Sequence, residues 1–131
     1  MMVLDASAVV ELLLGTETGR LVAACVADPA VDLHAPHLLD IEVTQVLRRL
    51  VKDGSLKPRE GREALDNLRG LDLEHHDHGA LLARVWALRE NLTAYDAVYV
   101  ALAEALGATL LTCDHKLGRA AGMGQRIRVL G

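Results

Sequence analysis

The sequence predicts a three-layer α/β/α sandwich around a mostly parallel sheet of about five strands. Short aliphatic runs alternate with amphipathic helical patterns along the whole chain, which is typical of βαβ units. Because a helix separates consecutive strands, we expect parallel pairing with right-handed crossovers. Hydrophobic residues make up 51% of the chain but aromatic residues only 2%, so aliphatic side chains must form the core between helices and sheet.

The first half of the chain contains two strand patterns, each followed by helical patterns. The expected elements are a strand at 2–5, helices at 8–14 and 17–27, a strand at 31–36 and a helix at 37–52. Gly15 and Gly54 follow helical patterns that they are suited to end, and Pro29 and Pro36 bound the second strand. Ser7 is placed to cap the first helix, although its hydroxyl also lies two residues from the acid that ends the first strand.

The second half continues the same alternation. The expected elements are a helix at 57–69, a strand at 71–75, helices at 80–90 and 93–106, a strand at 108–112, a short helix at 116–121 and a strand at 127–130. Segment 71–75 alternates apolar and polar residues, as a half-exposed edge strand does. Thr93 is a suitable N-cap for the helix that Gly107 ends. The residues of helix 80–90 expected to face inward are Leu81, Leu82, Val85, Trp86 and Leu88.

Length and composition limit the cellular context and the means of binding. With 131 residues the chain is long enough for one domain, residues 1–131, and too short for two. Since it has no signal-peptide pattern and no apolar run of membrane-spanning length, we expect a cytoplasmic protein without a membrane partner. The net charge of −4 argues against a protein that holds nucleic acid by bulk positive charge.

Four acids occupy positions that suggest a shared site. Asp5 and Asp114 follow strands, at the carboxyl edge where open α/β sheets bind ligands. Asp96 and Glu42 lie on the apolar, inward faces of their helices. Taken singly, Asp96 and Asp114 are better explained as a helix N-terminal acid and a turn residue. For Glu42 two partners stay open, a neighbouring arginine or a cation shared with the other acids.

Together the four acids require a counter-charge. Two carboxylates about 4 Å apart repel by roughly 1 kcal/mol in water and by about 4 kcal/mol at an effective dielectric constant of 20. Four carboxylates in one pocket would therefore protonate or move apart without a cation. Carboxylate oxygens without thiolates or a histidine pair favour Mg²⁺ or Mn²⁺, and an ion that keeps some of its waters suits phosphate esters.

The histidine-rich turn His75-His76-Asp77-His78 is a weaker candidate for a metal site. Neighbouring strand residues point to opposite faces, and no distant cysteine or histidine at ligand spacing completes a tetrahedral zinc site. We expect these histidines to lie away from the acids and to share no metal.

Four motifs carry a resemblance to a known family. They are Val3-Leu4-Asp5-Ala6-Ser7, Glu42 within its apolar helix, the stretch from Tyr95 to Ala103, and Leu111-Thr112-Cys113-Asp114. With these motifs in this order along the whole chain, the sequence resembles a PIN domain, specifically a VapC-type toxin of a toxin–antitoxin pair. The resemblance implies a five-stranded parallel sheet, a homodimer, magnesium-dependent ribonuclease activity and inhibition by a VapB-type antitoxin whose tail occupies the active site.

The resemblance also implies roles for individual residues. The metal and the catalytic chemistry would be carried by Asp5, Glu42, Asp96 and Asp114. The cation would activate a water for in-line attack on an RNA phosphodiester, with a 5′-phosphate and a free 3′-hydroxyl as products. Some relatives have a further acid shortly after the position of Asp114, where this chain has His115, so a fully liganded second metal site is not implied.

Five further residues are secondary candidates around the same site. Ser7 and Thr112 would hold waters and the strand-end carboxylates. His115, Lys116 and Arg119 would meet RNA phosphates, although a solvated surface explains Lys116 and Arg119 equally well.

Other classes of function remain as alternatives. A two-component-receiver-like signalling domain would need an acid pair after the first strand and a phosphoacceptor after the third, whereas Asp5 stands alone and the third strand runs into His75-His76. A phosphatase with an aspartyl nucleophile would need a second aspartate where Ser7 stands. A catalytically silent RNA- or protein-binding PIN domain is the third alternative, and the presence of all four acids argues against it.

Overall fold

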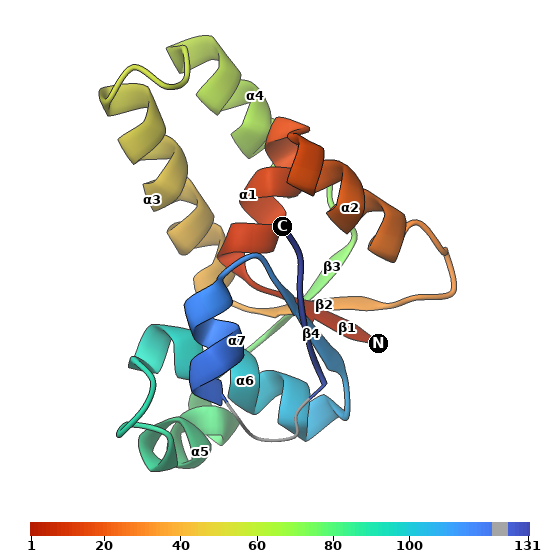
Figure 1. Cartoon of the computed structure of the whole chain (residues 1–131), viewed down its shortest axis with the longest axis vertical. Coiled ribbons are helices and arrows are strands. Elements are labelled where there is room, and N and C mark those ends of the chain that lie inside the picture. The colour runs from red at the N-terminus through yellow and green to blue at the C-terminus, as the bar shows by residue number, and fades with distance from the viewer. Residues whose placement is uncertain (122–125) are drawn as a thin grey trace.

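The computed structural model describes residues 1–121 and 126–131 and shows a five-stranded parallel sheet covered by helices on both faces (Figure 1). The strands are β1 (Met2–Leu4), β2 (Leu33–Pro36), β3 (Leu73–His76), β4 (Thr109–Thr112) and β5 (Ile127–Val129). Their order across the sheet is β3-β2-β1-β4-β5, and every pair is parallel. The predicted sandwich is confirmed, as is the edge position of the third strand. The sheet is entirely rather than mostly parallel.

The helices lie in the connections between strands, as the sequence predicts. They are α1 (Ala6–Leu14), α2 (Glu17–Val26), α3 (Leu38–Lys52), α4 (Pro58–Arg69), the 3₁₀ helix η1 (Gly79–Leu81), α5 (Leu82–Ala87), α6 (Ala94–Leu106) and α7 (His115–Ala121). Figure 1 shows α3 and α4 as a helical hairpin that projects from the sheet. Gly15 and Gly107 end α1 and α6 in the left-handed conformation, each with φ 63°, so both predicted stops are confirmed. Within the described ranges, no helix combines the length and apolarity needed to cross a membrane.

The core is centred on β1, β4 and α6. Val3 and Leu4 of β1 and Leu110 and Leu111 of β4 are completely buried, because helices cover both faces of these central strands. In α6 the residues 97–103 are all buried, and the helix packs on β1, β2 and β4. The two central strands and the central helix therefore fix the positions of the acids that follow or begin them.

Of the five residues of helix 80–90 that were expected to face inward, Leu82 and Trp86 do not. This segment forms η1 and the short helix α5, in which Leu82 is 60% exposed and Trp86 is 69% exposed. Leu81, Val85 and Leu88, spaced by four and three residues, form the buried face. Leu82 and Trp86 are four residues apart on a different face, so one short helix cannot bury both sets.

Candidate metal and active site

The end of β1 places Asp5 against the neighbouring strand β4. Asp5 is 5% exposed, and its Oδ1 accepts hydrogen bonds from Ser7 Oγ at 2.6 Å and from the Ala8 N–H at 3.0 Å. Its Oδ2 accepts a hydrogen bond from Thr112 Oγ1 at 2.5 Å. Asp5 is thus the N-cap of α1. The prediction that Ser7 caps this helix is wrong, because the helix begins at Ala6, one residue before Ser7.

Two hydroxyl groups connect Asp5 to the segment that follows β4. Ser7 Oγ accepts a hydrogen bond from the Cys113 N–H at 2.9 Å, and Thr112 Oγ1 accepts one from the Asp114 N–H at 2.9 Å. The two hydroxyl oxygens are 3.3 Å apart, and Thr112 is completely buried. Ser7 and Thr112 therefore hold the ends of both central strands in fixed relation to the Asp5 carboxylate.

Asp114 is half-buried and directly precedes the last helix. Its Oδ1 accepts hydrogen bonds from the Lys116 N–H at 2.8 Å and the Leu117 N–H at 3.3 Å, at the start of α7. His115, Lys116 and Arg119 are exposed. The His115 ring donates from Nε2 to the Gly131 carbonyl at 2.9 Å, which ties it to the C-terminal residue.

Asp96 and Glu42 are presented by helices. Thr93 caps α6 as predicted, since its Oγ1 accepts a hydrogen bond from the Asp96 N–H at 3.2 Å. Glu42, on α3, accepts a hydrogen bond from the Tyr99 hydroxyl at 2.5 Å. The hydrogen-bond partner of Glu42 is thus a tyrosine of α6, which the sequence analysis missed. The sequence contained a signal for this contact, because Tyr99 follows Asp96 by three residues and so lies on the same face of the helix.

The four carboxylates influence one another electrostatically. Burial raises the pKa of Asp5, and the charge of Asp114 raises it further against the opposing effect of three hydrogen bonds. The pKa of Glu42 is raised by burial and then by the charges of Asp96 and Asp5, while the Tyr99 hydrogen bond lowers it. Burial and the charge of Asp114 raise the pKa of Asp96. These couplings link all four acids into one region of negative charge.

The carboxylates are close enough to repel but are not packed around one point. Among residues 1–121 and 126–131, the group of three or more ligand side chains with donor atoms within 4.8 Å of one another is a different one, His34, Glu74 and His76. Repulsion favours this spacing, and the N-termini of α1 and α6 offset part of the negative charge. A cation held by the four acids would have to draw their side chains together.

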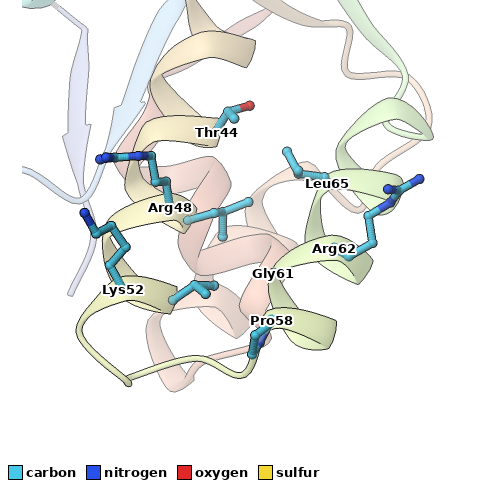
Figure 2. Close-up of a pocket in the computed structure, with 9 residues that line it drawn as sticks. Thr44, Arg48, Lys52, Pro58, Gly61, Arg62 and Leu65 are labelled. Atoms are coloured by element: carbon cyan, nitrogen blue, oxygen red, sulfur yellow. The ribbon is translucent and has the colours of Figure 1, made fainter.

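Two hollows border α3, and they differ in whether an acid lines them. One of about 310 Å³ includes Glu42 in its lining, together with Ala6, Leu38, Ile41, Gln45, Val46, Arg49 and Tyr95. A wider one of about 380 Å³ lies between α3 and α4 (Figure 2). None of the described residues that line it is an acid, and Arg48 and Lys52 extend from α3 away from it (Figure 2). The hollow at Glu42 is therefore the one that can serve chemistry at the acids.

The histidine-rich turn contacts other parts of the molecule. His75 Nε2 lies 3.1 Å from Asp40 Oδ1, and His78 Nε2 accepts a hydrogen bond from the Leu38 N–H at 3.1 Å. His76 Nε2 lies 2.9 Å from Nδ1 of His34 on the neighbouring strand β2. The sequence analysis overlooked His34, which lies 42 residues before His76 and reaches it only through strand pairing.

Comparisons of the sequence with known proteins point to one family. The family described as "PIN domain" matches residues 2–123. The chain is similar to VapC ribonuclease Mb0985 of Mycobacterium bovis, with 44% identity over 117 residues that cover 89% of this chain and 88% of that protein. It is also similar to ribonuclease VapC1 of Mycobacterium tuberculosis, with 40% identity over 129 residues, which cover 98% and 96% of the two chains.

Solved structures with a similar fold cover nearly the whole chain. The structure of VapBC2 from Rickettsia felis bound to a promoter DNA fragment matches with a TM-score of 0.71 and 16% identity, covering 99% of this chain and 98% of that chain. VapC20 of Mycobacterium tuberculosis, described as a sarcin-ricin loop cleaving toxin, matches with a TM-score of 0.71 and 14% identity, covering 98% and 99%. At these identities the likeness concerns the fold alone.

Proposed function

The chain belongs to the PIN-domain family, among the VapC ribonucleases, and from this we propose that it hydrolyses RNA phosphodiester bonds with a divalent cation held by Asp5, Glu42, Asp96 and Asp114. The observation that carries the proposal is that these four acids, which follow β1 and β4 or lie on α3 and α6, are at least partly buried and close enough for their charges to act on one another. Acids that raise one another's pKa in partly buried positions are typical of functional sites.

The donor set fits a hard cation. All four side chains offer carboxylate oxygens, which Mg²⁺ and Mn²⁺ prefer, and no thiolate takes part. Burial is the largest cause of the raised pKa values of Asp5, Glu42 and Asp96, and the charges of neighbouring acids raise these values further, so a bound cation would favour the charged carboxylates. Magnesium, when bound, would supply a Lewis acid for a phosphate oxygen and a water of lowered pKa.

The residues of the chain would anchor the cation, orient the attacking water and bind the substrate. Asp5 is immobilised by Ser7, Ala8 and Thr112, so it provides a fixed anchor for the cation. Glu42 and Asp96 are half-buried acids with raised pKa, which suits one of them to orient the attacking water and accept its proton. Substrate would approach from the hollow beside Glu42, in which Arg49 is placed to meet a phosphate. Lys116 and Arg119 are exposed and available for the same purpose.

Membership of the family suggests an RNA substrate and an antitoxin partner. We infer that the protein is the toxin of a toxin–antitoxin pair, acts on RNA in the cytoplasm as one PIN-like domain over residues 1–131, and is neutralised by a VapB-type antitoxin whose tail occupies the acid site. The relatives named as VapC ribonucleases and the VapBC2 structure support this proposal. A homodimer is part of this proposal, and the exposed apolar side chains Leu82 and Trp86 of α5 support it.

Substitution of Asp96 by asparagine tests the function. Asp96→Asn keeps the size of the side chain but removes a charge from the set, so we expect magnesium-dependent RNA cleavage to fall by at least about 100-fold. The melting temperature in excess chelator should stay unchanged or rise, because the repulsion between Asp96 and Asp114 is relieved. Cleavage is measured on purified protein with a labelled RNA, without antitoxin.

A matched control separates site chemistry from general charge effects. Asp66→Asn removes an exposed acid of α4 that pairs with Arg62 at 3.3 Å, and should leave cleavage unchanged. The proposal fails if the unsubstituted protein cleaves RNA equally well in excess chelator, or if Asp96→Asn retains full activity.

A further inference from the structure

A second cluster of metal-ligating side chains lies on the edge of the sheet, apart from the four acids. His34 on β2 pairs in register with Glu74 on β3, and His76 follows two residues later on β3. Residues two apart on a strand point to the same face, so parallel pairing brings all three side chains together. His34 is 5% exposed and Glu74 is exposed, so the cluster extends from the interior to the surface.

The donor atoms already have nearly the spacing of a metal site. His34 Nδ1 lies 2.9 Å from His76 Nε2 and 3.5 Å from Glu74 Oε2, and one ligand atom from each residue lies within 4.8 Å of the others. Ligands at about 2.0–2.2 Å from a tetrahedral zinc ion are about 3.3 Å apart. Shifts of a few tenths of an ångström between the two histidine nitrogens would therefore admit the ion.

Hydrogen bonding alone gives a poor account of His34. Its Nδ1 faces His76, but its Nε2 is a buried side-chain nitrogen for which the described residues provide no hydrogen-bond partner. A buried polar atom without a partner costs free energy that an apolar residue would avoid. The contact of Nδ1 with His76 and its 3.5 Å distance to Glu74 Oε2 make Nδ1 the ring nitrogen that faces the cluster.

A hollow lined by several acids adjoins Glu74, the exposed ligand of the cluster. Glu74 lines a hollow of about 340 Å³ at the edge of the sheet, and the same hollow is lined by Asp28, Asp32 and Asp72. These carboxylates create a negative potential that raises the local concentration of cations next to Glu74. A cation would thus approach the cluster from the side of Glu74.

We propose that His34 Nδ1, Glu74 and His76 Nε2 form a zinc site in which water completes a tetrahedron. Two imidazoles and one carboxylate are ligands that zinc takes, whereas magnesium prefers oxygen ligands alone. The two sites of the protein are therefore chemically distinct. Bound zinc would fasten the edge strand β3 to β2 and stabilise the fold, and RNA cleavage would not require it.

Titration of the metal-free, full-length protein with ZnCl₂ in excess MgCl₂ tests the site. Calorimetry should show one zinc ion per chain, and the melting temperature should rise on addition of zinc. His76→Gln and Glu74→Gln replace partly exposed ligands, so both variants should fold and bind zinc at least about 10- to 100-fold more weakly. His75→Gln changes the neighbouring histidine, which contacts Asp40 instead, and should keep the original affinity.

Three outcomes would overturn the zinc site. They are the absence of zinc binding at tens of micromolar protein, an affinity of His76→Gln equal to that of the unsubstituted chain, and a loss of zinc binding on Asp96→Asn, which would place the ion at the four acids. Because the titration does not depend on RNA cleavage, its result is independent of the proposed ribonuclease function.

Discussion

At the scale of single residues, the hydrogen bond from Tyr99 to Glu42 connects α6 to α3 beside the acids. The two residues are 57 positions apart, and the oxygen atoms are 2.5 Å from each other. Burial and the Glu42 hydrogen bond raise the pKa of Tyr99, so the phenol stays protonated and can only donate to the carboxylate. Tyr99 is therefore a positioning residue for Glu42.

Removal of the Tyr99 hydroxyl should loosen Glu42. For Tyr99→Phe we expect magnesium affinity to fall by about tenfold, because groups that orient metal ligands contribute affinities of this order. The free energy of unfolding should fall by about 1 kcal/mol, the usual contribution of one hydrogen bond. Tyr95→Phe on the same helix is the control, since Tyr95 is 62% exposed, and it should match the unsubstituted protein in both measurements. Equal magnesium affinity in the two variants would remove Tyr99 from the site.

The raised pKa of Glu42 predicts a pH dependence of stability. The folded protein binds a proton at Glu42 more tightly than the unfolded chain, whose usual value is 4.5. The resulting stabilisation is fully present below pH 4.5 and is lost as the pH rises through the higher folded pKa. In chelator, Glu42→Gln should therefore gain stability relative to the unsubstituted protein as the pH rises above 4.5. Urea unfolding between pH 4 and pH 8 measures the difference, and a difference that is independent of pH would contradict the coupling.

At the scale of elements, helix N-termini hold three of the four acids. Asp5 caps α1, Asp96 lies in the first turn of α6, and Asp114 accepts hydrogen bonds from the first turn of α7. The free N–H groups of a helix start favour negative charge, so the fold tolerates these acids before any cation binds. The same aspartates can therefore stabilise a helix start and bind a cation, because the hydrogen bonds at the helix start also orient the carboxylate.

Two threonine caps allow a test of this coupling between helix starts and the site. Thr93→Ala removes the N-cap of α6, next to Asp96. Thr16→Ala removes the N-cap of α2, where Thr16 Oγ1 accepts a hydrogen bond from the Gly19 N–H at 2.9 Å. Each should cost about 1 kcal/mol of unfolding free energy. Only Thr93→Ala should also reduce RNA cleavage and magnesium affinity. Equal activity of the two variants would show that the start of α6 does not position Asp96.

At the scale of the whole molecule, a band of exposed apolar side chains lies beside the acids. Ile41 of α3, Leu82 and Trp86 of α5 and Tyr95 of α6 are each at least 60% exposed. Leu38 and Tyr95 line both the hollow that contains Glu42 and a second hollow of about 170 Å³ formed with α5, so the apolar surface continues from Ile41 to Leu82. Trp86 lies one helical turn after Leu82 on α5. Contiguous apolar surface of this kind marks an interface, and a second copy of the chain is the partner that the family implies.

The proposed homodimer can be tested at Trp86. Light scattering at tens of micromolar should give twice the chain mass of 14.1 kDa for the unsubstituted protein. Trp86→Lys places a charge in the apolar surface and should yield the monomer mass. Leu21→Lys changes an exposed leucine of α2, 49% exposed and outside this surface, and should leave the dimer intact. A monomer mass for the unsubstituted protein would contradict the dimer, and dissociation by both variants would place the interface elsewhere.

The sequence by itself determined the alternation of strands and helices, the glycine stops and the four acids. These features depend on local periodicity and on residues next to each other, such as the apolar run that ends at Asp5 or the inward face that carries Asp96. The ordered motifs also identified the family, which the PIN-domain match confirms. The roles of the acids remain predictions.

The tertiary structure decided every contact that depends on strand order and helix packing. The order β3-β2-β1-β4-β5 brings Thr112 to Asp5 across 107 residues and His34 to His76 across 42. Packing of α6 selects Tyr99 as the partner of Glu42, and the short length of α5 leaves Trp86 exposed. Local patterns cannot encode these outcomes, because the pairing of distant segments is settled by the burial of the whole chain at once.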